Sequence, residues 1–422
     1  MRAICPLLLL ALVVGGVSQL EGAEARKGYH AKVAVSAPTR LDWIFAAANQ
    51  SPAKPPASWE TTGGMKDYDS TKQEYELFVP PAYTPAKPAA VVLFIAPGDA
   101  PGGWKAWQDV CQKNGVIFAA PLGVGNNCPT PRRVRIVLDV LDEIRRTYKT
   151  DPDRTYLAGF SGGGRIAAAI AFSLPELVGG VVPACATGEL RAEPWLRLRA
   201  IDRLSVALLT GDGDFNRGEV ERFRGPMLTE VGVRTKVWVF PKLGHAQPSG
   251  KDLVEVYKWL DDGAAARKKS AERWPASRMP AQAGLTREEA SAALLQEAQE
   301  RIKTRATEHS GLMQLMGIRT RWPDLPAAQE ATKLLVEFDA RPEKPWEADD
   351  IALTRKFLAA EARAISAYAT GPLPKEYEGQ RTDMAKAALS RWQQLVADGQ
   401  DAQAIEDAKK TMPELEKIVG GK

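Results

Sequence analysis

Between residues 89 and 242, short β-branched runs alternate with segments of helical pattern, and this alternation constrains the fold more than any other feature of the chain. The runs are Val91–Ala96, Val116–Ala120, Thr155–Ala158, Val178–Cys185, Val206–Thr210 and Lys236–Phe240. Continuous apolar strands separated by helices are typical of a parallel sheet buried on both faces. An earlier, more exposed strand is expected at Tyr75–Pro80. We therefore predict an α/β fold with a mostly parallel, doubly wound sheet and helices on both faces.

The rest of the chain differs in character from this sheet domain, which we place at residues 26–263. Residues 264–284 are rich in Lys, Arg, Pro and Ala without an apolar period, which indicates a linker. Thr286 and Glu289 have the spacing of a capping box, and apolar residues recur at helical spacing after them. Residues 285–422 are therefore expected to form an all-α C-terminal domain, for packing or for binding a protein partner.

The first 25 residues have the features of a secretory signal peptide. Arg2 is followed by the apolar run Leu7–Val14 and by the small residues around Ala25. A membrane anchor is the alternative, but Gly15 and Gly16 end the run well short of the ~20 apolar residues that a span needs. We expect cleavage after Ala25, a secreted or periplasmic protein, and no stable membrane span.

Composition excludes one class of partner and raises one question about redox state. The formal charge of +4 over 422 residues, without a dense basic stripe, argues against nucleic-acid binding. Removal of residues 1–25 leaves three cysteines, Cys111, Cys128 and Cys185. In an oxidising compartment, one disulfide and one free thiol fit this odd count, with three pairings open. A buried free thiol is the other interpretation for Cys185.

The segment Gly159-Phe160-Ser161-Gly162-Gly163 joins an expected strand to an expected helix. A serine flanked by glycines at such a turn is typical of a nucleophile elbow. A serine hydroxyl needs a histidine to take its proton and an acid to orient that histidine. The chain has three histidines, and two lie outside the strand–helix region, which leaves His245 after the last strand. The pattern therefore predicts Ser161 as nucleophile and His245 as base.

The acid is expected in the turn after Val206–Thr210, because the order serine, acid, histidine then holds along the chain. Asp214 is the preferred residue, and Asp212 is the rival that would instead cap its own turn. For the oxyanion, the N–H of Gly162 is the first expected donor. Pro97 has no N–H, so the second donor is expected to be Asp99 or Ala100.

Together, the elbow, the acid turn, the Gly-His loop and the strand at Tyr75–Pro80 resemble the α/β-hydrolase fold. Within it, the stretch from Asp151 to Gly163 is similar to the secreted polyhydroxybutyrate depolymerase and feruloyl esterase branch. The resemblance covers roughly residues 75–262, and implies a serine esterase with Ser161, Asp214 and His245 as its triad and with no metal or cofactor. The sequence departs from that branch at Pro97, where most members carry a histidine, and in its helical C-terminal region.

Only about twenty residues separate Ala186 from Ser205, which leaves little room for a helical lid. We therefore expect an open site that acts on a small-molecule ester or on a bulky, polymer-linked one. Trp104, Trp107 and Trp195 are candidates for lining it, although burial in the core is the commoner role for tryptophan. A peptidase or lactonase of the same fold is an alternative, as is a catalytically degenerate envelope scaffold.

Overall fold

The computed structural model of the chain describes residues 26–48, 65, 67–282 and 284–421. The expected signal peptide and its cleavage point after Ala25 therefore lie outside the described residues. Within the described part of the chain, no helix combines the length and the apolar character needed to cross a membrane.

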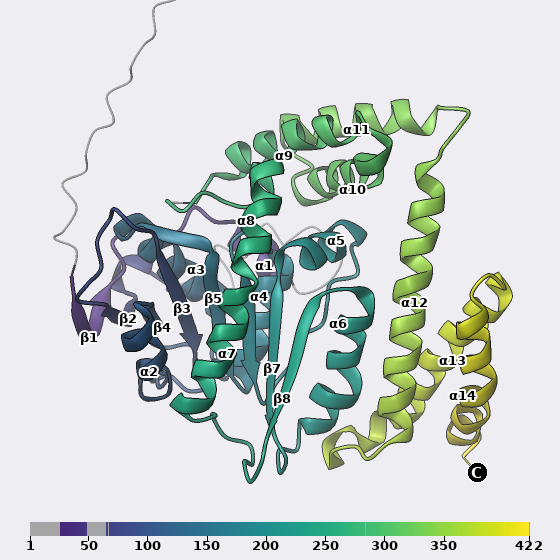
Figure 1. The fold of residues 1–422 in the computed structure, drawn as a ribbon, viewed down its shortest axis with the longest axis horizontal. Coiled ribbons are helices and arrows are strands. Elements are labelled where there is room, and N and C mark those ends of the chain that lie inside the picture. Colours follow the sequence, from purple (N-terminus) through teal and green to yellow (C-terminus); the bar gives the residue numbers. More distant parts are fainter. Residues whose placement is uncertain (1–25, 49–64, 66, 283, 422) are drawn as a thin grey trace, which may run out of the picture.

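Eight strands form one sheet in the order β1-β2-β4-β3-β5-β6-β7-β8 (Figure 1). Their bounds are Gly28–Ala34 (β1), Glu74–Val79 (β2), Ala89–Ile95 (β3), Ile117–Pro121 (β4), Thr150–Phe160 (β5), Gly180–Ala184 (β6), Ser205–Gly211 (β7) and Arg234–Phe240 (β8). Strands β3 to β8 pair in parallel, whereas β2 pairs antiparallel with both β1 and β4. The predicted, mostly parallel α/β sheet is confirmed.

Apolar side chains alternate between the two faces of this sheet, so each central strand contributes to two cores. Val91, Leu93 and Ile95 of β3 belong to one buried cluster, whereas Val92 and Phe94 belong to another on the opposite face. The helices that cover the sheet are α1 (Trp43–Ala47), α2 (Trp104–Asn114), α3 (Thr130–Thr147), α4 (Gly162–Ser173), α5 (Pro194–Arg203), α6 (Gly225–Val231) and α7 (Gly250–Asp262). Helices α2 and α7 cover the face to which Val92 and Phe94 belong, and α1, α3, α4 and α6 cover the opposite face. This burial on both faces explains the continuous apolar runs of the sequence.

The segment expected to be an irregular linker, residues 264–284, is instead largely ordered against the sheet. It contains helix α8 (Ala264–Arg273) and a 3-10 turn, η4 (Pro275–Ser277). Arg267 of α8 is 4% exposed and donates hydrogen bonds to the carbonyl of Asp153 and to Ser205 Oγ. A segment rich in Lys and Arg can therefore pack here, because its buried guanidinium forms hydrogen bonds near the start of the strands. An analysis of apolar periodicity does not detect such contacts.

The C-terminal region is helical throughout, as predicted. Its elements are α9 (Arg287–Arg301), α10 (Arg305–Arg321), α11 (Pro326–Asp339), α12 (Trp346–Thr370), the 3-10 turn η5 (Lys375–Gln380), α13 (Arg381–Asp398) and α14 (Ala402–Gly420). The capping box at the start of α9 is present, since Thr286 Oγ1 accepts from Glu289 N and Glu289 Oε2 accepts from Thr286 N. The long helix α12 runs beside α6, with α13 and α14 on its outer side (Figure 1).

The expected disulfide is absent from the described residues, where Cys111, Cys128 and Cys185 are all free. Cys111 is buried in the cluster under α2 and α7, whereas Cys128 packs against the cluster on the opposite face of the sheet. Cys185 directly follows strand β6, at a third location. The expectation of one disulfide was therefore wrong, because the sheet separates these thiols. The alternative for Cys185, a buried free thiol, is what the structure contains.

Candidate active site

Ser161 occupies a sharp turn between the end of β5 and the start of α4. Its backbone dihedrals are φ 52° and ψ −124°, a region that a residue with a side chain rarely adopts. Ser161 N donates to Ala184 O at 2.9 Å, which ties the turn to the end of β6. A Cβ atom on Gly163 would lie 2.0 Å from Ile95 O, so helix α4 can approach the end of β3 only without a side chain there. The turn has the geometry expected of a nucleophile elbow.

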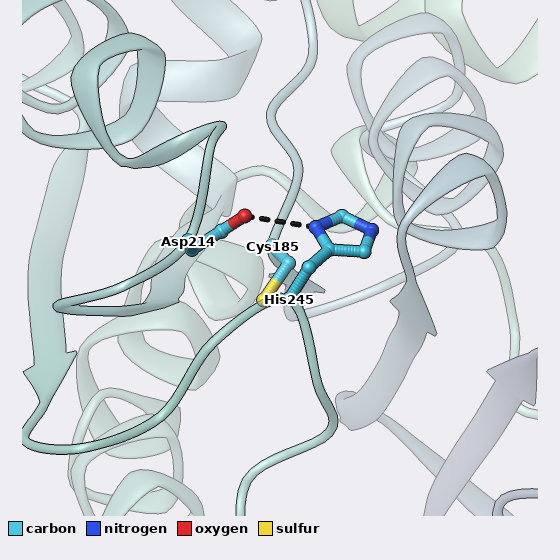
Figure 2. Close-up of side chains that lie close together, drawn as sticks. All are labelled: Cys185, Asp214 and His245. Carbon is cyan, nitrogen blue, oxygen red and sulfur yellow. Dashed lines mark hydrogen bonds and ion pairs between the residues drawn. The ribbon is translucent and has the colours of Figure 1, made fainter.

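The three residues predicted as a triad come together from three separate loops. His245 Nε2 lies 2.9 Å from Ser161 Oγ, and His245 Nδ1 lies 2.8 Å from Asp214 Oδ1. Figure 2 shows the second contact, with the imidazole facing the carboxylate. Because the ionised carboxylate can only accept, Nδ1 carries the proton and Nε2 presents its lone pair to the serine hydroxyl. The rival acid, Asp212, is exposed in the same turn, and its N–H donates to Phe240 O.

This site lies where the direction of strand connection reverses. The chain passes from β3 to β4 on one side and then to β5 on the other, and Ser161 follows β5. Asp214 follows β7 and His245 follows β8. Parallel strands end at one edge of the sheet, and ligands bind there at the point of reversal. The topology therefore brings the three loops to one place.

Asp214 is buried and is held as a carboxylate by several donors. Its side chain is fully shielded from solvent, and its Oδ2 accepts from Thr210 Oγ1 at 2.8 Å. Its Oδ1 accepts from Asn216 N at 3.0 Å as well as from His245. Burial by itself raises the pKa of Asp214, but the hydrogen bonds from His245, Asn216 and Thr210 more than offset this and hold the pKa below its usual value. An ionised acid at this position orients the imidazole and stabilises its charged form.

The expected oxyanion donors lie in two adjacent places. Gly162 is the first residue of α4, so its N–H has no acceptor within the helix. Asp99 and Ala100 are exposed in the loop after β3, beside the elbow. Asp99 is tied to the loop after β4, since its carbonyl accepts from Gly123 N at 2.8 Å and its Oδ1 accepts from Gly125 N at 3.0 Å. The roles of Gly162, Asp99 and Ala100 stay predictions.

Two aromatic rings that the sequence analysis did not single out flank His245. The Phe215 ring stacks on the imidazole with centroids 4.2 Å apart, and the Phe160 ring lies 5.1 Å away. Phe215 is 53% exposed, which is unusual for a phenylalanine. In the sequence, Phe215 directly follows the predicted acid and Phe160 directly precedes the predicted nucleophile. This adjacency is the signal from which both rings could have been predicted to lie at the site. Of the tryptophans considered, Trp107 and Trp195 are buried in the core, so neither lines the site.

Cys185 lies beside the acid and the histidine (Figure 2). Its Sγ, an Asp214 carboxylate oxygen and a His245 ring nitrogen lie within 4.8 Å of one another, so their atom types match a metal site. A metal would require the thiolate, yet burial raises the pKa of the Cys185 thiol to about 12. A metal would also have to replace the bond between Asp214 and His245. The thiol donates instead towards Ala246 O at 3.4 Å, so Cys185 packs against the histidine loop.

The helical C-terminal region reaches the same end of the sheet. Arg222, in the π-helical turn η3 (Glu219–Arg224) that follows the acid loop, donates to Ala367 O at 3.1 Å and to Pro372 O. Phe223 stacks on Tyr368 with centroids 5.3 Å apart. Glu219 also accepts a bidentate pair of hydrogen bonds from Arg165, four residues beyond the nucleophile. The end of α12 therefore packs against the turn that follows the acid loop.

The strand order, the antiparallel second strand and the elbow after β5 define an α/β-hydrolase fold with a serine, histidine and aspartate constellation. A scan against protein-family models gave no match, and a search of the curated proteins gave none either.

Solved structures that resemble the chain do so distantly. A thermostable esterase is 19% identical with a TM-score of 0.34, over 46% of this chain and 60% of that one. S-formylglutathione hydrolase from Staphylococcus aureus is 11% identical with a TM-score of 0.36, over 57% of this chain and 100% of that one. A feruloyl esterase module from Clostridium thermocellum, complexed with sinapinate, is 15% identical with a TM-score of 0.32, over 44% and 82%.

Proposed function

We propose that the chain is a serine hydrolase that cleaves carboxylic esters through an acyl-enzyme intermediate. One observation carries the proposal: the continuous hydrogen-bonded series from Ser161 Oγ through His245 to the buried Asp214 carboxylate. Nucleophile, base and orienting acid in that geometry are the requirements of acyl transfer. The elbow supplies a partly exposed hydroxyl, and the start of α4 supplies an N–H where negative charge develops.

The two half-reactions follow from these positions. Ser161 Oγ attacks the ester carbonyl carbon while His245 Nε2 takes the hydroxyl proton, and the carbonyl electron pair moves to oxygen. The carbonyl re-forms as the alcohol leaves with the proton from His245. Water then attacks the acyl-serine by the same route, with His245 as base, and releases the acid and the serine. Asp214 keeps the imidazole oriented and stabilises its charge in both steps.

We further propose that the substrate is a bulky or polymer-linked ester and that the protein acts outside the cytoplasm. The histidine side chain is 22% exposed and the neighbouring Phe215 ring is largely exposed. An exposed aromatic ring beside the reacting groups offers a bulky substrate an apolar surface. The basic start and short apolar run of the first 25 residues support export.

A fluorophosphonate probe tests whether the constellation is active. The folded protein should gain a single adduct, located on Ser161 by peptide mass spectrometry, because only an activated serine displaces fluoride from the probe and becomes phosphonylated. Protein denatured before exposure should gain none. A folded protein that takes up no label would contradict the proposal and favour the catalytically degenerate scaffold.

A further inference from the structure

Asn126, in the loop between β4 and α3, lies against the residue that follows the nucleophile. A Cβ atom on Gly162 would lie 2.0 Å from Asn126 Oδ1 and 3.1 Å from Asn126 Nδ2. The carboxamide therefore occupies the space beside Gly162, and only glycine leaves room for it there. Gly162 carries the N–H expected to bind the oxyanion, so the Asn126 side chain lies at the edge of that binding position.

Arg133 determines which way the Asn126 carboxamide faces. Arg133 Nη1 donates to Asn126 Oδ1 at 3.3 Å, and its Nη2 donates to Ala96 O at 3.4 Å. A guanidinium has no acceptor, so the atom facing it must be the amide oxygen. Arg133 is itself 5% exposed, which makes its position well defined. The Nδ2 amide is thus directed away from Arg133, and none of the described residues accepts a hydrogen bond from it.

The backbone of this loop is fastened to the loop that should contribute the second oxyanion donor. Asn126 N donates to Pro97 O at 2.8 Å, in addition to the two bonds that tie Gly123 and Gly125 to Asp99. Three hydrogen bonds therefore join the loop after β4 to the loop after β3. A donor held this way needs no rearrangement when charge develops, which is the condition for effective electrostatic stabilisation.

The N–H donors of the loop after β3 include those of Gly98, Asp99 and Ala100. Pro97 has no N–H. Gly125 packs closely against the peptide bond between Gly98 and Asp99. A Cβ atom on Gly125 would lie 3.1 Å from both Asp99 N and Gly98 C. One side of that peptide is therefore covered by Gly125 rather than open to a ligand. The adjoining loop brings a side-chain amide, that of Asn126, next to these backbone groups.

We propose that the Nδ2 amide of Asn126 donates a hydrogen bond to the oxyanion, together with Gly162 N–H. This inference rests on the proposed esterase function and adds a residue that contacts the reacting atoms. As the bond from Ser161 Oγ to the carbonyl carbon forms, the electron pair of the carbonyl moves onto its oxygen. The Asn126 amide stabilises this charge more than it stabilises the neutral carbonyl, so it should act on kcat rather than on KM.

Asn126→Asp is the sharpest test, because the variant keeps the size of the side chain and an acceptor for Arg133 but loses the N–H donor. With p-nitrophenyl acetate we expect kcat to fall by about 10²–10³-fold with KM little changed. Asn126→Ala should lose a similar factor. Affinity for a trifluoromethyl ketone, which forms a tetrahedral adduct on the serine, should fall in parallel with kcat/KM. Asn127→Ala, at the exposed neighbouring position, is the matched control and should keep wild-type kinetics.

Two results would overturn the inference without touching the proposed function. One is an Asn126→Asp variant with wild-type kcat, which would assign the asparagine a packing role through Arg133. The other is a loss that appears only in KM. In both cases the wild-type protein still hydrolyses the ester and takes up the fluorophosphonate label. A wild-type protein that does neither would instead remove the proposed function itself.

Discussion

At the scale of single residues, the surrounding hydrogen-bond donors determine which aspartate is the acid of the triad. Asp214 and Asp212 are two positions apart in one turn after β7, yet only Asp214 faces His245. Thr210 and the backbone of Asn216 hold the Asp214 carboxylate, whereas Asp212 is exposed. The sequence placed both aspartates at the correct edge of the sheet, but the choice between them depends on turn geometry that residue types do not encode.

Asp214→Asn should lower kcat for p-nitrophenyl acetate by about 10⁴-fold, because a neutral amide neither stabilises the imidazolium nor enforces the same tautomer. Asp212→Asn, a matched change two residues away, should leave kcat unaltered. Steady-state kinetics of the two variants at neutral pH make the comparison. Equal losses in both variants, or a loss in Asp212→Asn alone, would show that the acid is misassigned.

At the scale of elements, the sequence predicted the strands that are buried along their length and missed two elements, β1 and α8, that lack a continuous apolar pattern. The six apolar runs match β3 to β8. Strands β3 to β7 are buried along almost their whole length, so few polar positions obscure them, whereas β8 is an edge strand in which only Trp238 is buried. Strand β1 was missed because it is an edge strand in which six of the seven residues, including Tyr29 and His30, are not buried. Helix α8 was missed because its buried residues are Arg267 and two alanines, Ala264 and Ala271, which do not form an apolar stripe. Tertiary hydrogen bonds, rather than local pattern, place both elements.

Contact between elements also joins the sheet domain to the helical region. Arg321, the last residue of α10, donates to Glu176 Oε1 at 2.7 Å in the turn between α4 and β6. Both residues are buried. Burial raises the pKa of the Glu176 carboxyl, but attraction to Arg321 and Arg199 outweighs it and holds the pKa below the usual 4.5. The ion pair is therefore stabilising above that usual pKa, and its contribution is lost as the pH falls through the lowered value of the folded state.

Glu176→Gln should lower the free energy of unfolding by about 3 kcal/mol at neutral pH, since it leaves the charge of Arg321 buried with fewer partners. Urea unfolding at pH 7 and again near ~3 should show the gap between variant and wild type closing at acid pH, where the wild-type carboxyl is protonated in the unfolded chain. Glu300→Gln, in an exposed pair with Lys303, is the control and should change stability little at either pH. A gap that is independent of pH would contradict the assigned ionisation.

At the scale of the whole molecule, the hydrolase sheet and the helical region form one continuous body around the site. A single apolar cluster runs from the sheet through α4 into α9, α10 and α11. At the other end, α12 contacts the turn that follows the acid loop. The helical character of this region was predictable from its periodicity, whereas its contact with the turn that follows the acid loop depends on the packing of Arg222, Phe223 and Tyr368. The candidate triad was predictable because the fold leaves only His245 near the elbow, while Asn126 and Phe215 reach the site through loop geometry alone.

The central claim, that Ser161 is the nucleophile of an esterase, is tested most directly by p-nitrophenyl acetate hydrolysis in Ser161→Ala. The variant should fall to the weak residual rate that binding and an oxyanion hole sustain, about 10³–10⁴-fold over water. Ser390→Ala, at an exposed position on α13, controls for the loss of a serine hydroxyl and should retain the wild-type rate. Wild-type kcat/KM in Ser161→Ala would contradict the account.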